Sequence, residues 1–222
     1  MERIIQLSSD GSHTISIPAL QTTYHSKHGA IGESRHVFAE AGFGFVQTVF
    51  PNQTIHILEI GFGTGLNALL TYIAAAEKKL RVHYTAIEPF PLYRKEIEKL
   101  NYGILLNSKE IFISLHEPPF EKMAQVSVDF SITKTKQTLN HVKPVSEIHC
   151  IYHDAFAPEI QAELWTRDFF EKLYSLLAPK GILVTYCSKS IVRKAMTDAG
   201  FRVTKIPGPW GKREMVRAIK DY

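Results

Sequence analysis

The stretch Glu59-Ile60-Gly61-Phe62-Gly63-Thr64-Gly65-Leu66-Asn67 decides the fold of this chain. It begins at the end of a run of strand-forming residues, Ile55–Ile60, and leads into a helical stretch, Leu66–Glu77. Its three glycines in alternate positions permit positive φ angles and let a ligand approach the backbone closely. Such a turn between strand and helix lies at the carboxyl edge of a parallel sheet, where these folds bind ligands. We therefore expect a ligand site here.

The spacing of the glycines indicates the kind of ligand. G-x-G-x-G differs from the G-x-G-x-x-G of pyrophosphate binders, and it suits a nucleoside that carries a charged amino-acid tail. Glu88 ends the next expected strand, Arg81–Glu88, where a carboxylate can accept hydrogen bonds from ribose hydroxyls. Two alternatives remain open: a turn that serves only tight packing of helix against sheet, and a site for NAD.

Strands and helices alternate through the rest of the chain, which predicts an α/β fold with a mostly parallel, doubly wound sheet. The last two strands are joined by the short turn Pro207-Gly208-Pro209, so we expect a C-terminal antiparallel hairpin. The other expected strands are Glu110–Leu115, Val126–Ile132, Glu147–His153, Gly181–Cys187, Phe201–Ile206 and Lys212–Ile219; the other helices are Pro91–Leu100, Leu164–Leu177, which Pro179-Lys180-Gly181 stops, and Ser190–Ala199.

The first 54 residues precede this regular order. A small hairpin or edge strand is expected near His13–Ile17, followed by a helix around Val37 whose end is weakened by the glycines of Gly42–Phe45. We expect residues 1–54 to form an N-terminal extension that covers substrate and cofactor. Residues 55–222 are expected to form one globular domain.

The composition is that of a folded protein with a real core. The chain has 222 residues, of which 45% are hydrophobic, and this suits one α/β domain. Its uncharged apolar stretches are far shorter than the ~20 residues that span a bilayer. Its start, Met1-Glu2-Arg3-Ile4-Ile5-Gln6, does not have the pattern of a secretion signal. We expect a cytoplasmic protein without a membrane partner, in which Cys150 and Cys187 are buried free thiols.

Positive charge is concentrated at the end of the chain. From Lys189 to Tyr222, nine basic residues face three acidic ones, so this basic tail carries +6 and the remainder carries −2. A basic flank on a near-neutral body indicates a polyanionic partner, although charge runs often serve only solubility. The basic residues are Lys189, Arg193, Lys194, Arg202, Lys205, Lys212, Arg213, Arg217 and Lys220.

A second candidate site, His153-Asp154-Ala155-Phe156-Ala157-Pro158, follows the strand Glu147–His153. Asp154 is expected at the same sheet edge as the glycine turn. Its carboxylate can capture a protonated amine, and Phe156 can stack on a substrate base; the amine must lose a proton before its nitrogen becomes a nucleophile. The alternative is that Asp154 only caps the following helix. No metal is expected, because His25, His28 and His36 are too dispersed to bind one.

A combination of motifs is more specific than any one of them. The motifs are Ser26…Gly29…Glu33-Ser34…Val37-Phe38, the glycine run to Asn67, Glu88-Pro89-Phe90-Pro91-Leu92, Asp154-Ala155-Phe156-Ala157-Pro158 with Leu164-Trp165-Thr166, and Gly211-Lys212-Arg213-Glu214-Met215. Together they resemble the tRNA 5-methylaminomethyl-2-thiouridine methyltransferases, the methyltransferase half of bifunctional MnmC. The resemblance runs from about Tyr24 to Arg217. The glycine run alone would indicate only a methyltransferase.

The resemblance implies a class I Rossmann-like methyltransferase fold with S-adenosyl-L-methionine as cofactor. The implied reaction methylates the 5-aminomethyl group of the tRNA wobble (2-thio)uridine, giving 5-methylaminomethyl. The implied partner is the tRNA anticodon loop, where a single-stranded base turns outward at little cost. Asp154 would be the catalytic residue that faces the amine. The cofactor site would comprise Glu59, Gly61, Gly63, Thr64, Gly65, Asn67 and Glu88, and the substrate site Phe156, Pro158, Lys189, Lys212 and Arg213.

Two features depart from the family pattern. The bifunctional enzymes continue into a flavin-dependent oxidase domain, whereas this sequence stops at Tyr222. We therefore expect a stand-alone methyltransferase linked to other enzymes that supply its aminomethyl substrate. The family often has Gly-Asp near the end of the third strand, in contact with the adenine. The corresponding Ile132-Thr133-Lys134-Thr135 has Lys134 in place of the acid, so adenine recognition is left to backbone groups.

Two other functions fit the same features. A methyltransferase that acts on a small molecule or a protein would use the same scaffold without needing the basic tail. A catalytically silent RNA-binding module would keep the fold and the charge but transfer no methyl group.

Overall fold

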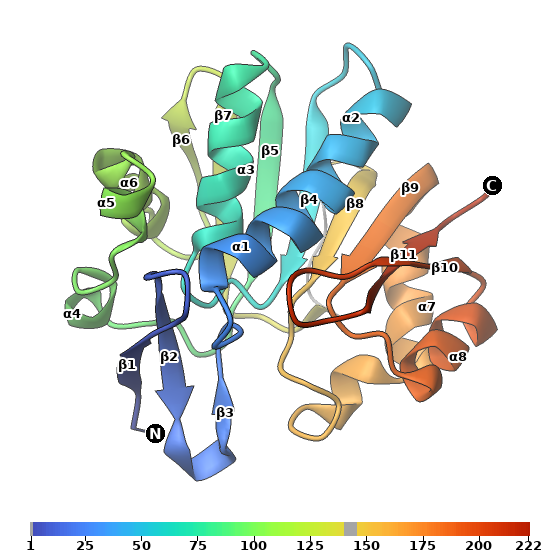
Figure 1. Ribbon diagram of the computed structural model, residues 1–222. Helices are drawn as coiled ribbons and strands as arrows, with labels where there is room; N and C mark the ends of the chain where they lie inside the picture. The colour runs from blue at the N-terminus through green and yellow to red at the C-terminus, as the bar shows by residue number, and fades with distance from the viewer. Residues whose placement is uncertain (1, 140–145) are drawn as a thin grey trace.

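The computed structural model describes residues 2–139 and 146–222 (Figure 1). Its central strands are β4 (Ile55–Ile60), β5 (Val82–Ile87), β6 (Met123–Ser127), β7 (Phe130–Thr135), β8 (Ile148–His153), β9 (Leu177–Thr185), β10 (Arg202–Pro207) and β11 (Glu214–Ile219). They form one eight-stranded sheet in the order β10-β11-β9-β8-β4-β5-β7-β6. The five middle strands are parallel, and antiparallel strands close both edges. The expected mostly parallel sheet and its C-terminal antiparallel hairpin are confirmed.

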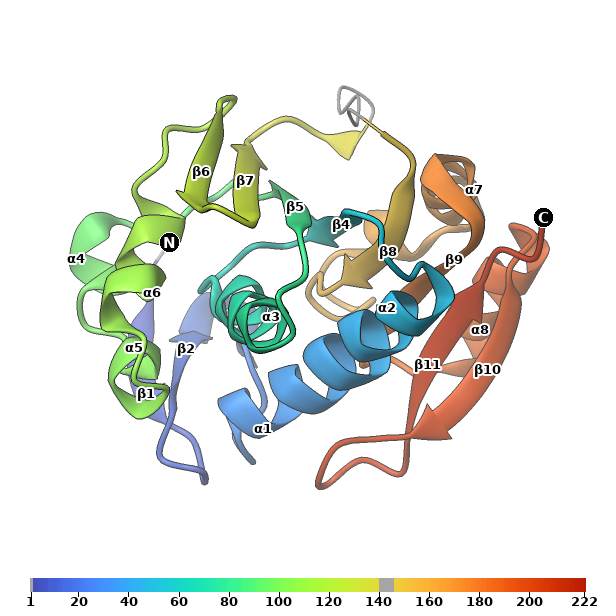
Figure 2. The ribbon, with the colours of Figure 1, turned by 90° about the horizontal axis from the view of Figure 1, so that it is seen from above.

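Helices cover both faces of this sheet, as in a doubly wound fold (Figure 2). The helices on one face are α1 (Ala30–Ser34), η2 (Arg35–Gly44), α2 (Phe45–Val49) and α3 (Leu66–Glu77), and those on the other are α7 (Arg167–Leu176) and α8 (Ser190–Asp198). Because neighbouring residues of a strand point to opposite faces, Ile57 packs in the first core and Leu58 in the second. The shorter helices are α4 (Arg94–Ile97), α5 (Tyr102–Leu105), α6 (Lys109–His116) and η4 (Ala162–Trp165).

A separate antiparallel sheet precedes these elements and consists of β1 (Ile4–Leu7), β2 (His13–Ile17) and β3 (Thr22–Thr23), with the turn η1 (Pro18–Leu20) before β3. The strand expected near His13–Ile17 is therefore the middle strand of three. The sheet is anchored by the segment that follows α4: Asn101 Oδ1 accepts a hydrogen bond from His13 N at 2.9 Å, and the Tyr102 hydroxyl donates to His13 O. These contacts hold the small sheet beside the carboxyl edge of the central one (Figure 1).

Residues 30–49 form one continuous helical segment in which η2 has wider, π-type turns. The expectation that Gly42–Phe45 weakens the end of this helix is wrong, because the helix continues to Val49. Gly42 serves packing instead: a Cβ atom there would lie 2.8 Å from Tyr152 Cε1. The missing side chain lets the helix lie close to the sheet.

The prediction of a strand at Glu110–Leu115 is wrong, since these residues belong to α6. A short apolar run does not distinguish a strand from a buried helix. Phe112 and Leu115, three residues apart, are both buried, and the Phe112 ring packs against Tyr102. The tertiary contacts of one helical face decide this segment.

The alternating pattern of Val126–Ile132 predicted a single strand, but the structure has two. β6 ends at Ser127 and β7 begins at Phe130, and the two pair antiparallel with an irregular register. Val128 lies in the turn between them and is 91% exposed. The alternating pattern therefore spanned a hairpin.

Two expected helices are shorter in the structure. Within Pro91–Leu100, only Arg94–Ile97 is assigned as a helix. α7 ends at Leu176, before Pro179-Lys180-Gly181, and that turn lies inside β9 as an irregularity in its pairing with β8. Lys180 has a φ of +67° there.

Both cysteines are free and buried, which confirms that expectation for Cys150 and Cys187. Within residues 2–139 and 146–222, no helix combines the length and apolar character needed to cross a bilayer. The same residues contain no group of three or more His, Cys, Asp or Glu side chains arranged to hold a metal ion.

Candidate active site

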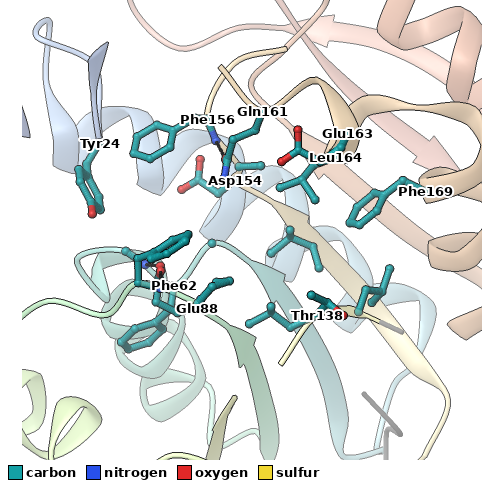
Figure 3. A pocket seen from close by; sticks show the side chains of 18 of the residues that line it. Tyr24, Phe62, Glu88, Thr138, Asp154, Phe156, Gln161, Glu163, Leu164 and Phe169 are labelled. Atoms are coloured by element: carbon teal, nitrogen blue, oxygen red, sulfur yellow. Dashed lines mark hydrogen bonds between the residues drawn. The ribbon is translucent and has the colours of Figure 1, made fainter. Parts of the chain in front are cut away.

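A cleft with a volume of about 320 Å3 opens at the carboxyl edge of the central sheet (Figure 3). The glycine turn after β4 forms its base, and Glu88 lies on one side. Asp154 and Phe156, from the loop after β8, lie on the opposite side. Tyr24 borders one end and Phe169 the other. The topology therefore brings both candidate sites of the sequence to one cavity.

The glycine turn depends on glycine for both conformation and space. Gly61, Gly63 and Gly65 have φ angles of +91°, +50° and +74°, a region that side chains disfavour. A Cβ atom on Gly61 would lie 2.7 Å from the carbonyl oxygen of Asp154. At Gly65 it would lie 2.7 Å from His116 Nε2. The first of these contacts makes Gly61 the point where the two candidate sites touch.

Glu88 holds this turn in place. It is 8% exposed, and its two carboxylate oxygens accept hydrogen bonds from Gly63 N and Phe90 N, each at 2.8 Å. Burial raises the pKa of Glu88, while the two N–H donors and Arg3 act in the opposite direction. A carboxylate offers about four lone pairs, so Glu88 has capacity left for hydroxyl donors of a ligand.

Tyr24 and His25 connect the N-terminal sheet to the turn. His25 Nε2 and Thr64 Oγ1 lie 2.6 Å apart in a buried contact. The Tyr24 ring lies against Gly63 and meets Phe156 edge to face, with ring centroids 5.2 Å apart. Burial lowers the pKa of His25 to about 4 and raises that of Tyr24 to about 12, so both are neutral near pH 7. In the sequence, the only indication that Tyr24 and His25 belong to the site was their position directly before the first family motif.

Asn67 joins two buried carboxyl groups. Its Nδ2 donates to Glu59 Oε1 and to Asp154 Oδ2, each at 2.8 Å. Glu59 is fully buried behind the turn, whereas Asp154 faces the cleft. Burial raises the pKa of both carboxyl groups well above their usual values, and the neighbouring Asp154 raises that of Glu59 further. Asp154 Oδ1 is bonded to no residue that the structure describes, so it is available to a ligand.

Side chains from later elements fix the backbone of the Asp154 loop. Tyr186 Oη donates to Ala155 O at 2.9 Å, and Trp165 Nε1 donates to Phe156 O at 2.8 Å. These bonds fix the loop in the position that turns the carboxyl group of Asp154 toward the cleft.

The alternative role of Asp154 as a helix cap is not supported. The next α-helix, α7, is capped by Thr166, whose side chain accepts a hydrogen bond from Phe169 N. Gln161 precedes η4, and its Oε1 accepts from Phe156 N at 2.8 Å. Asp154 therefore remains directed to the cleft.

Lys134, expected at the position of the adenine-contacting acid, does not line the cleft. It is 2% exposed, and its Nζ donates to His116 O at 2.5 Å and lies over the Phe62 ring. Burial lowers the pKa of Lys134 to about 8. The cleft at the end of β7 is lined by Thr138 and Leu139 instead.

Within the described part of the chain, five of the nine cations of the basic tail form local ion pairs, three of them with acids of the tail itself. Lys189 pairs with Glu159, and Lys212 pairs with Glu33 at 2.6 Å. Arg213 is exposed and has no ion pair with any residue in the described ranges. Three further tail residues are paired: Lys194 with Asp198, Arg202 with Asp221, and Lys205 with Glu214.

The expected site residues fall into three groups. Those that line the cleft are Gly61, Gly63, Thr64, Glu88, Asp154 and Phe156. Those that support it from behind are Glu59, Gly65 and Asn67, and those that lie outside its lining are Pro158, Lys189, Lys212 and Arg213. Sequence reasoning missed Tyr24, His25, Phe90, Gln161, Leu164 and Phe169, which line the cleft from separate segments of the chain.

The residues present fit S-adenosyl-L-methionine. The absent side chains at Gly61 and Gly63 leave room beside the backbone, and Glu88 can accept from ribose hydroxyls. The buried carboxyl group of Glu59 complements the positive charge of the cofactor, and Asp154 is left for an acceptor group. Ile60 and Leu139 give the cleft apolar surface for an adenine ring.

Known proteins have similar sequences. The chain is 32% identical over 227 residues to the tRNA 5-methylaminomethyl-2-thiouridine biosynthesis bifunctional protein MnmC of Cupriavidus metallidurans, covering 96% of this chain and 33% of that protein. The protein of the same name from Burkholderia multivorans is 30% identical over 219 residues, covering 91% and 33%. The chain spans about a third of the length of these relatives.

Solved structures share the fold. The crystal structure of MnmC2 from Aquifex aeolicus matches with a TM-score of 0.76 and 27% identity, covering 98% of this chain and 70% of that one. Spermidine synthase from Thermotoga maritima matches with a TM-score of 0.58 and 13% identity, covering 98% and 68%, which shows the fold alone. The expected Rossmann-like methyltransferase fold and the resemblance to the methyltransferase part of MnmC are confirmed.

A family model described as S-adenosyl-L-methionine-dependent methyltransferase matches residues 106–221. This range contains the Asp154 loop and the C-terminal hairpin, whereas the glycine turn precedes it. The glycine turn, the carboxyl groups of Glu88 and Asp154 and the fold all agree with this match. The chain belongs to the S-adenosyl-L-methionine-dependent methyltransferases.

Proposed function

We propose that this methyltransferase converts the 5-aminomethyl group of the tRNA wobble (2-thio)uridine to 5-methylaminomethyl. The observation that carries the proposal is Asp154, whose carboxyl group faces the cleft beside the glycine turn with one oxygen available. A carboxylate in that place suits an amine acceptor, which is mostly protonated at neutral pH. The names of the MnmC relatives, which specify tRNA 5-methylaminomethyl-2-thiouridine biosynthesis, support tRNA as the substrate.

The glycine turn and Glu88 hold the cofactor in this proposal. Gly61, Gly63 and Thr64 present backbone to it, and Glu88 accepts from its ribose hydroxyls. Gly65 fixes the turn from behind, and Glu59 and Asn67 add negative and polar character beneath the amino-acid end. When bound, S-adenosyl-L-methionine supplies an electrophilic methyl group on a positively charged sulfur.

Asp154 captures the amine and removes its proton. Oδ2 stays hydrogen-bonded to Asn67, which fixes the carboxyl group, and Oδ1 accepts a hydrogen bond from the protonated amine. Because burial raises the pKa of Asp154, its carboxylate is a better base than an exposed aspartate. Oδ1 takes the proton that must leave before the nitrogen lone pair can attack. Orientation of the amine adds to the rate.

The substrate base lies against Phe156, with Pro158 shaping the same loop. Tyr24, in edge-to-face contact with Phe156, limits the space on the other side. We assign residues 1–54 the role of covering the site, because Tyr24 and His25 line the cleft. The helical segment of residues 30–49 meanwhile packs into the core of residues 55–222, the proposed methyltransferase domain.

The anticodon loop of tRNA is the proposed partner, with Lys189, Lys212 and Arg213 near its phosphates. Arg213 is available for such a contact. Lys189 and Lys212 would exchange Glu159 and Glu33 for phosphate oxygens. Enzymes that install the 5-aminomethyl group on uridine must supply the substrate, so a functional link to them is part of the proposal.

A methyltransferase acting on a small molecule or a protein is the second candidate. It is favoured by the pairing of Lys189 and Lys212 with Glu159 and Glu33, two acids outside the tail, which offset part of its +6 charge.

Transfer of a radiolabelled methyl group separates these candidates. Purified protein is incubated with labelled S-adenosyl-L-methionine and tRNA from cells that lack this modification, and nucleosides are identified by mass. Label in 5-methylaminomethyl(-2-thio)uridine at the wobble position supports the proposal. Label confined to other acceptors favours the second candidate. RNA binding without any transfer identifies a silent RNA-binding module and contradicts both.

A further inference from the structure

Trp210 is the most exposed aromatic side chain among the described residues, at 93%. It lies in the segment Pro207–Arg213, hereafter the hairpin loop, which comprises the last residue of β10 and the turn that leads to β11. Single exposed apolar side chains are common on protein surfaces and need no explanation alone. The structure of the hairpin loop, its neighbours and its charge distinguish Trp210 from such cases.

The hairpin loop presents Trp210 on an ordered backbone. Gly208 N donates to Arg213 O at 3.2 Å, and Lys212 N donates to Pro209 O at 2.9 Å. His36 Nε2 lies 2.8 Å from Pro207 O, which ties the loop to η2. Because the backbone is held in advance, only the indole side chain must be ordered when a ligand stacks on it.

Side-chain contacts connect the hairpin loop to the catalytic edge. Lys212 Nζ lies 4.6 Å from the centre of the Tyr186 ring, and the Tyr186 hydroxyl holds the carbonyl of Ala155, next to Asp154. Gly211 lies against the His28 ring, close to Tyr24 in sequence. The loop therefore borders the segments that carry Tyr24 and Asp154, and Figure 1 shows it beside the start of α1.

The surroundings of Trp210 are cationic and not apolar. The hairpin loop contains Arg213 and Lys212, which pairs with Glu33, and it has no acidic residue of its own. Lys27 and His28 are exposed on the adjoining loop, and neither Lys27 nor Arg213 has an ion pair among residues 2–139 and 146–222. The loop offers no second large apolar side chain, so a protein surface would find little to bury. An unpaired nucleic-acid base, stacked on the indole with its phosphates beside the cations, fits this chemistry.

We propose that Trp210 is a stacking surface for an unpaired base of the anticodon loop, next to the uridine that enters the cleft. This inference rests on the proposed tRNA substrate and adds an RNA contact outside the cavity. Aromatic stacking recognises single-stranded RNA and discriminates against duplex, whose bases are already stacked. Trp210 thereby positions the loop so that the neighbouring uridine reaches Asp154.

Tryptophan fluorescence tests the stacking directly. The chain has two tryptophans, and Trp165 is buried at 5% exposure, so collisional quenchers in solution report on Trp210. A synthetic anticodon stem-loop with 5-aminomethyluridine at the wobble position should quench this emission and shield it from iodide. A duplex RNA of equal charge should not. Equal quenching by the duplex would indicate a phosphate contact alone and overturn the inference. Quenching that rises with protein concentration in the absence of RNA would place Trp210 in a contact between protein molecules, and it would also overturn the inference.

Variants extend the test to activity. Trp210→Ala should raise KM for the stem-loop by about tenfold, the order expected for loss of one stacked base, with little change in kcat. Trp210→Phe should restore most of the affinity. Tyr222→Ala, which removes an aromatic side chain that is 91% exposed at the C-terminus, is the matched control and should behave as wild type. Unchanged KM in Trp210→Ala overturns the inference.

The two proposals fail in different ways. Methyl transfer to the wobble uridine with no quenching of Trp210 leaves the proposed function standing and overturns the stacking role. Quenching by the stem-loop without methyl transfer supports the stacking role and contradicts the proposed reaction.

Discussion

At the amino edge of the central sheet, three histidines lie in a row, while carboxyl groups occupy the opposite edge. His149, His56 and His83 are the second residues of β8, β4 and β5. The His56 ring centroid lies 5.5 Å from each of the other two. His149 Nδ1 accepts from His56 N at 3.1 Å, and His83 Nδ1 lies 2.8 Å from Ser131 Oγ. Within the row, only His149 Nδ1 accepts a hydrogen bond, and the buried Nδ1 of His56 has no partner among the described residues.

The carboxyl edge of the same strands differs in space and in charge. Gly61 has no side chain, and the backbone there bends away to leave a cleft. Burial raises the pKa of Glu88 and Asp154, and it lowers the pKa of His56, His83 and His149. Charge is therefore disfavoured at both edges, but only the carboxyl edge gives a cationic ligand room to compensate it. A row of polar residues becomes a binding site where the backbone leaves space.

The largest effect is expected from closing that space with Gly61→Ala. The new Cβ would lie 2.7 Å from Asp154 O at a φ of +91°, and strain and overpacking each cost on the order of 1–3 kcal/mol. Calorimetry should detect no binding of S-adenosyl-L-methionine, and the melting temperature should fall. Gly32→Ala is the control, because its nearest atom would be 3.8 Å away within a helix. Normal cofactor affinity in Gly61→Ala would contradict the assigned turn.

Asp154→Ala should separate the two functions of the carboxyl edge. Removing the acceptor should lower turnover by about a hundredfold or more, the usual range for an acid–base group, while cofactor binding measured by calorimetry persists. Asp154→Asn keeps an oxygen for Asn67 but lacks a basic group, so it should also be slow. Nearly intact activity in either variant would remove Asp154 from the mechanism.

Substitution of a histidine at the amino edge should change the stability of the fold and leave cofactor binding unchanged. Burial lowers the pKa of His56 to about 4, so the folded protein binds fewer protons there than the unfolded chain, whose histidines titrate near about 6.5. This contribution is present above about pH 6.5 and is lost as the pH falls toward about 4. Urea unfolding of His56→Leu should therefore show a shallower loss of stability over this window than wild type. Equal slopes would show that His56 is not kept neutral by the fold.

The smallest effect is expected outside the cleft, in Lys212→Met with Arg213→Met. Each lost phosphate contact lowers the slope of log binding constant against log salt by roughly one. Because Lys212 already pairs with Glu33, Arg213→Met alone should account for most of the change in filter binding with tRNA. Lys194→Met, which removes a cation paired with Asp198 on α8, is the matched control. An unchanged slope in the double variant would move the RNA surface elsewhere.

The cofactor half of the site was readable from the sequence because its signals are local. Gly61, Gly63 and Gly65 follow a strand directly, and Glu88 follows the next one, so strand order alone places them together. Asp154 was located in the same way. The role of Asn67 was not: only the fold shows that its amide group joins Glu59 to Asp154.

The errors arose where neighbours in space decide the outcome. Residues 109–116 have the composition of a strand, but Phe112 and Leu115 bury one face of a helix. Val128 fitted an alternating pattern, yet it lies in a turn because β6 pairs back onto β7. Lys134 replaced an acid in the motif, but its side chain runs to His116 and away from the cleft.

The sequence by itself determined the α/β order, the glycine turn and the acids after two strands, since backbone conformation and strand ends depend on adjacent residues. Tertiary structure alone decided which distant groups complete the site. It brought Tyr24 and His25 to the turn, placed Tyr186 on the Asp154 loop, and paired much of the basic tail with acids. Such contacts depend on how separate elements pack, and packing is settled by the shape of the whole core.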